Sequence, residues 1–296
     1  MYLKLCKYEF KSIARTLLPI YLAVVVVSLI NALSFGVNDL FHAGSMVTGY
    51  GAAIQLPHAA NTLVGLMQLV VFLAYFGVMV ALFVLTLIVI IQRFYKGLLC
   101  DEGYLMFTLP VKPWQLIASK GTAAFGMSVI SGAAAFLSIL ILMCGVVGPV
   151  EFFSSIFDPR IWWQMFGDLN EVFPKWGLYV LLYCFEFLIL AIVSGMAGLF
   201  PVYVAMALGH LAQRRRILMS VAAYLVISMA LSFLRGAGMM LLDGSGILHA
   251  LTPMIGSSAH TGIQLMVFGL LAWNILKLAA FFFGAERILS QKLNLE

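Results

Sequence analysis

The chain has 296 residues, of which 63% are hydrophobic and only 10% are charged, and its mean hydropathy is +1.06. Soluble domains carry about 25% charged residues, so this composition excludes an ordinary soluble protein and indicates an all-α membrane protein. Lys and Arg number 17 against 12 Asp and Glu, an excess that membrane topology explains better than nucleic-acid binding. The four cysteines form no CxxC pair and lie in segments predicted to be membranous or cytosolic, so no disulfide framework is expected.

Residues 1–17 are predicted to form an amphipathic helix in the membrane interface. Apolar side chains at 3-4-3-4 spacing share one stripe, namely Leu3, Cys6, Phe10, Ile13 and Leu17. Basic side chains share another face, namely Lys4, Lys7, Lys11 and Arg15. This arrangement suits a helix whose basic side faces anionic lipid headgroups. The alternative is a cytosolic lead-in to the first span.

Six apolar stretches then predict six transmembrane helices in one transmembrane domain, 1–296. The expected spans are 18–34, 62–91, 121–147, 176–210, 217–242 and 262–284. Outside loops are expected at 36–61, 150–175 and 243–261. The basic start runs into a full-length span without a small-residue cleavage site, which predicts no cleavable signal peptide.

The distribution of Lys and Arg predicts the orientation. Thirteen of the 17 lie in the N-terminal segment, in 93–120, in the 214–216 turn and in the C-terminal tail. Two lie in the alternate loops and two within spans. The positive-inside rule therefore places both termini in the cytosol of a multi-pass protein of the cell membrane.

The segment between the second and third spans, RFYKGLLCDEGYLMFTLPVKPWQLIASK, covers 93–120. Its acidic pair, Asp101 and Glu102, precedes the apolar run YLMFTL, and Pro110 ends any helix there. Asp101 suits a helix N-cap and Glu102 suits the positive helix start. An apolar two-turn segment outside the membrane needs a cover, from the chain itself or from a partner protein. The alternative is a hairpin that dips its apolar side into lipid.

Enzymatic motifs are missing from the sequence. It contains no GxxxxGK(S/T), HExxH or GxSxG pattern, and its histidines show no ligand spacing. We therefore expect neither catalysis nor a metal or cofactor in this chain.

Three ionisable residues fall within spans: Glu186, Arg235 and Lys277. They are candidates for a substrate pathway or, for Glu186 and Lys277, an ion pair, while Arg235 can instead extend to the outer surface.

Two pairs of small residues spaced four apart, Ser128 with Gly132 and Ser194 with Gly198, suggest close helix packing, in a tight bundle or at a dimer seam.

The 93–120 segment resembles the cytosolic segment between the second and third spans of ABC transporter permeases of the type-2 exporter class, in a subgroup from Gram-positive bacteria. Two further stretches agree, YVAMALGHLAQRRRILMSVAAY at 203–224 and the terminal KLNLE. The resemblance implies that 101–109 is a coupling helix fitting a groove on a separate ATPase subunit. The docking residues it implies are Asp101, Glu102, Tyr104, Leu105, Phe107 and Leu109.

The resemblance also implies that ATP and Mg²⁺ are bound by the partner ATPase, and that a second permease subunit, identical or different, completes the transporter. The expected function is the membrane-spanning subunit of an ATP-driven exporter. The alternative is a sensor or assembly protein that docks a cytosolic partner without transport. An intramembrane enzyme is the third and weakest hypothesis.

Overall fold

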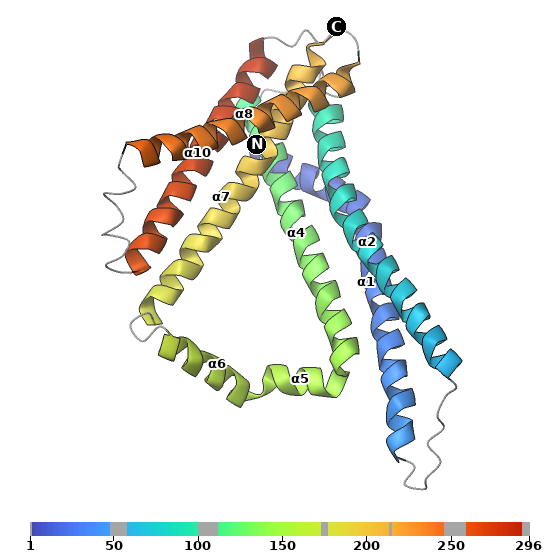
Figure 1. Ribbon diagram of the computed structural model, residues 1–296. Helices are drawn as coiled ribbons and strands as arrows, with labels where there is room; N and C mark the ends of the chain where they lie inside the picture. The colour runs from blue at the N-terminus through green and yellow to red at the C-terminus, as the bar shows by residue number, and fades with distance from the viewer. Residues whose placement is uncertain are drawn as a thin grey trace. The chain divides into compact units, whose positions relative to one another are not determined.

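The computed structural model describes residues 2–47, 58–99, 112–172, 177–212, 215–245 and 259–291. These residues form eight helices and no strand (Figure 1). The helices are α1 (Tyr2–Val47), α2 (His58–Leu99), α4 (Pro113–Val147), α5 (Pro149–Phe157), α6 (Pro159–Val172), α7 (Gly177–His210), α8 (Arg216–Gly244) and α10 (Ala259–Gln291).

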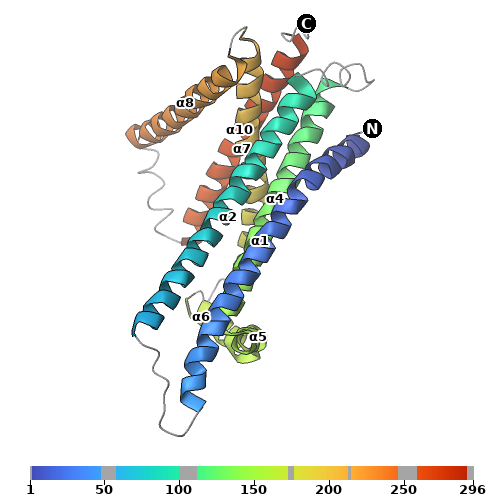
Figure 2. The same cartoon turned by 90° about the vertical axis from the view of Figure 1, so that its right-hand side faces the viewer.

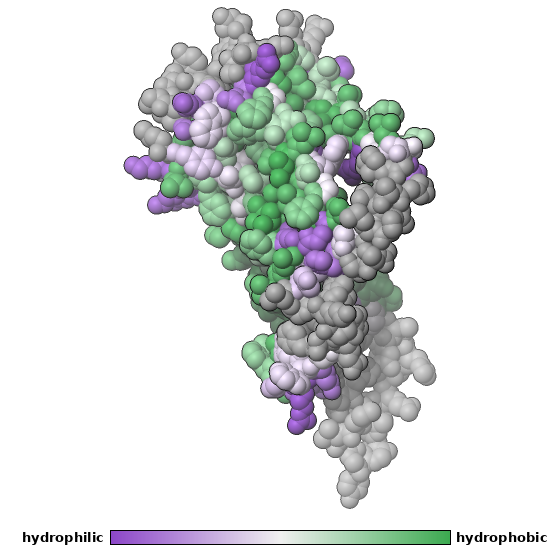
Figure 3. All heavy atoms as spheres, turned by 90° about the vertical axis from the view of Figure 1, so that its left-hand side faces the viewer, coloured by the Kyte–Doolittle hydropathy of each residue, from purple (hydrophilic) through white to green (hydrophobic). Residues whose placement is uncertain are grey.

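Six of these helices are long and apolar enough to cross a membrane. Their apolar stretches are Tyr2–Phe35, Gly65–Leu98, Pro113–Val147, Leu181–His210, Arg216–Leu241 and His260–Leu289. Many large apolar side chains on them point outward, as expected of surfaces that face lipid acyl chains. Among the coloured residues in Figure 3, apolar ones predominate and hydrophilic ones form small groups. These observations confirm the predicted all-helical fold with six helices that are long and apolar enough to span a membrane.

The N-terminal segment and the first span form one helix. α1 runs without interruption through residues 17 and 18, contains Pro19, and continues to Val47, although the first span was expected to end at residue 34. No proline follows between 36 and 47 to end the helix, which explains the extension. Leu3, expected on the apolar stripe, is 80% exposed, whereas Ile13 and Leu17 are buried. An interfacial position for the first turns stays a prediction.

Two short helices occupy the predicted outside segment 150–175. α5 begins at Pro149 after Gly148, whose φ of 91° lies in the left-handed region that glycine adopts readily. α6 begins at Pro159. Proline at the first helical position loses no hydrogen bond and already has a helical φ, so both starts follow from the sequence.

The chain divides into two compact units. Unit 1 comprises 1–10, 90–125 and 177–296, and unit 2 comprises 11–89 and 126–176. Because α1, α2 and α4 contribute to both, this division leaves the prediction of a single permease domain open.

In unit 2, a row of small residues on α4 lets α1 and α2 approach closely. Ser131, Ser138 and Gly145 recur at heptad spacing and are all buried. Tyr21 of α1 and Thr86 of α2 hydrogen-bond to Ser131 at 2.8 and 3.0 Å. We call Ser131, Ser138 and Gly145 the α4 seam.

The seam continues along α4 towards its C-terminal end. Tyr75 of α2 bonds to Ser138 at 3.1 Å. At Gly145 a Cβ atom would lie 2.3 Å from the Cα atom of Ala32, so the backbones of α1 and α4 are in contact there. Gly132 and Gly198, which the sequence suggested for close packing, have nothing within 4 Å of an added Cβ.

In unit 1, α7 packs against both α8 and α10 (Figures 1 and 2). The end of α7 lies close against the start of α8, because a Cβ at Gly209 would lie 2.4 Å from the backbone nitrogen of Ser220. Arg215, directly before α8, adopts a left-handed backbone with φ 55°. α7 is a single helix that contains Pro201.

Candidate functional site

The six predicted docking residues lie outside the described residues: Asp101, Glu102, Tyr104, Leu105, Phe107 and Leu109. The structure does describe the helix ends that flank them. α2 ends at Leu99 and α4 begins at Pro113. Unit 1 contains residues 93–99 of α2, 113–120 of α4 and 2–9 of α1. We call these three stretches together the segment base.

Three charged side chains meet at the segment base. The Nζ atom of Lys120 donates to Oε1 of Glu9 at 2.6 Å, and Nε of Arg93 lies 3.6 Å from Oε2 of the same carboxylate. Lys120 is 5% exposed and Glu9 is 7% exposed. Charges this deeply buried persist only when they are paired, because removing them from water costs several kcal/mol each. The cluster therefore fixes the start of α1 to both ends of the 93–120 segment.

Glycine at position 97 makes room for this cluster. A Cβ atom there would lie 2.4 Å from the Nζ atom of Lys120. Any side chain at this position of α2 would displace the amine that bonds to Glu9.

Two further contacts tie α1 to α4. The hydroxyl of Tyr2 lies 3.0 Å from Oγ1 of Thr122, and Sγ of Cys6 lies 3.5 Å from the same oxygen. Tyr2, Cys6 and Glu9 follow helical spacing, so one face of the first turns of α1 rests on α4.

An aromatic core joins the segment base to α7 and α10. Phe94 of α2 stacks on Tyr203 of α7, with ring centroids 3.9 Å apart and 8° between the ring planes. Phe200 packs edge-on against both Tyr203 and Phe282 of α10. The other buried members of this core are Ile90, Leu98, Leu116, Ile117, Ala124, Val204, Met206, Ala285 and Leu289. Displacement of the segment base would therefore strain α7 and α10 directly, because close-packed cores deform little.

The intramembrane candidate Glu186 has a polar partner on α10. The amide nitrogen of Gln264 donates to both carboxylate oxygens of Glu186, at 3.0 and 3.1 Å. Nearby in sequence, the hydroxyl of Tyr183 hydrogen-bonds to Nδ1 of His260. The ring of Tyr179 also contacts His260, at a centroid distance of 4.2 Å. These contacts provide polar links between two apolar helices.

The other two intramembrane candidates lie on separate helices. Arg235 on α8 is exposed, and Lys277 on α10 is half-buried. Both ion pairs in the described part of the chain involve Glu9, so an ion pair between Glu186 and Lys277 stays a prediction, as does a pathway role for the three residues.

We expect Gln264→Leu to lower the free energy of unfolding by about 1–3 kcal/mol, because it leaves the Glu186 carboxylate without its hydrogen-bond donor. The double variant Glu186→Leu/Gln264→Leu should recover most of this loss, since replacing both partners with apolar groups can be nearly neutral. Denaturant unfolding in detergent micelles measures both values. Equal losses for the single and double variants would show that an unpaired Glu186 carboxylate is not what destabilises Gln264→Leu.

Sequence reasoning missed Glu9 and the aromatic stack. Glu9 is the sole acidic residue within 1–17. It lies three residues after Cys6 and four before Ile13, on the side of the helix where a charge is least expected. This unusual position is the feature of the sequence from which the role of Glu9 could have been predicted. No feature of the sequence indicates that Phe94 pairs with Tyr203, because more than a hundred residues separate them.

Comparisons with protein-family models, with curated proteins and with solved structures find no match for this chain.

Proposed function

We propose that this chain is the membrane-spanning permease subunit of an ATP-driven exporter, working with a separate ATPase and a second permease subunit. The proposal rests on the buried charge cluster at the segment base. Glu9, Lys120 and Arg93 hold both ends of the 93–120 segment in one buried cluster. A segment that receives force from a partner needs such a rigid attachment. The six apolar helices supply the membrane-spanning part.

In this proposal, ATP binding and hydrolysis take place in the partner ATPase, which holds ATP and Mg²⁺. The apolar side chains Tyr104, Leu105, Phe107 and Leu109 dock in the ATPase groove, and Asp101 and Glu102 start the coupling helix. Closure of the two ATPases then moves the segment base. The cytosolic location of this segment and of both termini rests on the Lys and Arg distribution.

Phe94 and Tyr203 offer a route for this movement into the spans. Their stacked rings connect α2 to α7 only two residues after Pro201. Proline removes one helical hydrogen bond, so α7 bends more easily there than elsewhere. Movement at the base thus shifts the inner end of α7 against α10. Substrate then moves outwards by alternating access or by a lateral opening between spans.

The test is purification of the tagged full-length chain from its own cells with its native partners. We expect an ATPase with nucleotide-binding motifs to accompany the wild type. The variant Tyr104→Ala/Phe107→Ala should recover about fivefold less of it, because aromatic side chains carry a large share of interface energy. Mass spectrometry of the purified complex measures the recovery.

A matched control comes from the predicted outside segment. Phe157→Ala/Trp163→Ala also removes two exposed aromatic rings, which are 75% and 82% exposed, and should leave ATPase recovery unchanged. Wild-type recovery with the Tyr104/Phe107 variant would place the docking surface elsewhere. A wild-type chain that brings down a cytosolic partner without ATPase activity would favour the sensor or assembly protein instead.

A further inference from the structure

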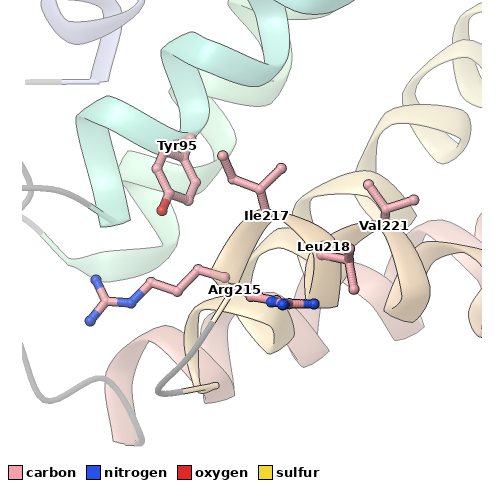
Figure 4. Close-up of a pocket in the computed structure, with 6 residues that line it drawn as sticks. Tyr95, Arg215, Ile217, Leu218 and Val221 are labelled. Atoms are coloured by element: carbon pink, nitrogen blue, oxygen red, sulfur yellow. The ribbon is translucent and has the colours of Figure 1, made fainter.

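A cavity of about 880 Å³ opens in unit 1 beside the turn between α7 and α8. Figure 4 shows Tyr95 of α2 on one side and the beginning of α8 on the other. The residues that line it are Tyr95, Arg215, Arg216, Ile217, Leu218 and Val221. Of these residues only Tyr95 belongs to the segment base, and the proposed coupling route does not involve the other five.

The polar part of the lining is cationic. Arg215 and Arg216 are both exposed, and neither forms an ion pair with a carboxylate among the described residues. Nη1 of Arg216 donates to Nε2 of His210 at 3.3 Å, which leaves its other donors available. Two cationic side chains at consecutive positions of the lining favour an anion with several oxygen acceptors, such as a phosphate.

The remaining wall is apolar. Ile217, Leu218 and Val221 are 73%, 59% and 55% exposed. They continue from the two arginines directly into the apolar stretch Arg216–Leu241. A small water-soluble anion would gain nothing from this wall, whereas a hydrocarbon chain would bury it.

The cavity also lies at the depth where the apolar stretches end. One of them starts at Arg216, a second ends at His210, and Tyr95 lies just before the end of a third at Leu98. Arginine and tyrosine are common at this level, where lipid headgroups begin. The positive-inside rule assigns this end of the spans to the cytosolic leaflet.

We propose that this cavity binds one anionic phospholipid of the inner leaflet. Arg215 and Arg216 hold its phosphate, and Ile217, Leu218 and Val221 line its acyl chain. Charge complementarity and the continuous apolar wall favour lipid over an acidic protein surface, which would leave those three side chains uncovered. None of its lining residues is among the proposed docking residues 101–109, and the site does not depend on the exporter function.

Native mass spectrometry of the purified full-length chain in detergent, titrated with phosphatidylglycerol or phosphatidylcholine, tests the proposal. We expect one tightly held phosphatidylglycerol. Its binding should weaken by about tenfold in Arg215→Gln/Arg216→Gln, because each basic residue adds attraction to an anionic headgroup. The control Arg160→Gln removes an exposed arginine of α6 and should bind as the wild type does. Circular dichroism verifies that each variant is folded.

Two further arms identify the source of the phosphate. Glycerol 3-phosphate, which has the headgroup chemistry without acyl chains, should not displace the bound phosphatidylglycerol even when it is in large molar excess. Leu218→Asn should weaken phosphatidylglycerol binding while both arginines remain. Equal binding by the Arg215/Arg216 variant, equal retention of phosphatidylcholine, or displacement by glycerol 3-phosphate would overturn the proposal. So would loss of an ATPase partner, and not of lipid, when the two arginines are replaced.

Discussion

Lys120→Met is expected to lower the free energy of unfolding by about 3–5 kcal/mol, the cost of leaving one member of a buried ion pair without its partner. Glu9 is 7% exposed and would keep only the contact to Arg93, whose Nε atom is 3.6 Å away. The start of α1 should then detach from α4. Denaturant unfolding in detergent micelles measures the stability, and limited proteolysis near residue 9 reports the detachment.

Two variants make this result specific. Glu9→Met/Lys120→Met should recover most of the lost stability, because apolar side chains of similar volume often replace a buried ion pair at little cost. Arg93 should tolerate the loss of the Glu9 carboxylate because its side chain is 36% exposed. Lys96→Met removes an exposed lysine of the same region and should change stability by less than about 0.5 kcal/mol. If Lys120→Met behaves like Lys96→Met, the buried cluster does not hold the segment base.

Gly145→Ala should cost about 1–3 kcal/mol, because the added methyl group forces two packed helices apart. A Cβ at this position would lie 2.3 Å from the Cα atom and 2.5 Å from the carbonyl oxygen of Ala32. Both are backbone atoms, so no side-chain rotation relieves the clash. The neighbouring hydrogen bond from Asn31 to the carbonyl of Val71, at 3.1 Å, should weaken as α1 moves.

Gly132→Ala is the matched control on the same helix. Nothing lies within 4 Å of a Cβ at that position, and alanine favours a helix over glycine by about 1 kcal/mol. We therefore expect this change to be neutral or stabilising. Thermal unfolding of the two variants in one detergent measures the contrast. A loss at Gly132 as large as that at Gly145 would mean that helix packing is not the cause.

Sequence periodicity and composition anticipated the six membrane-crossing helices and their order. Such helices satisfy their own backbone hydrogen bonds and need about 20 apolar residues each, so the signal is local. Helix ends were anticipated less well. α1 continues to Val47, α2 to Leu99, and α4 starts at Pro113, because polar residues continue a helix unless proline or a cap ends it.

An all-helical chain with six apolar helices could thus be predicted from the amino-acid sequence, which also singled out 93–120 as the exceptional segment between two of them. Three contacts became visible only in the folded chain: Glu9 pairs with Lys120, Phe94 stacks on Tyr203, and Gly145, not Gly132, lies where two helices touch. The two kinds of feature differ in the sequence distance over which they act. Hydropathy and helix formation depend on neighbouring residues, whereas these contacts join residues far apart in the chain and depend on which helix faces meet.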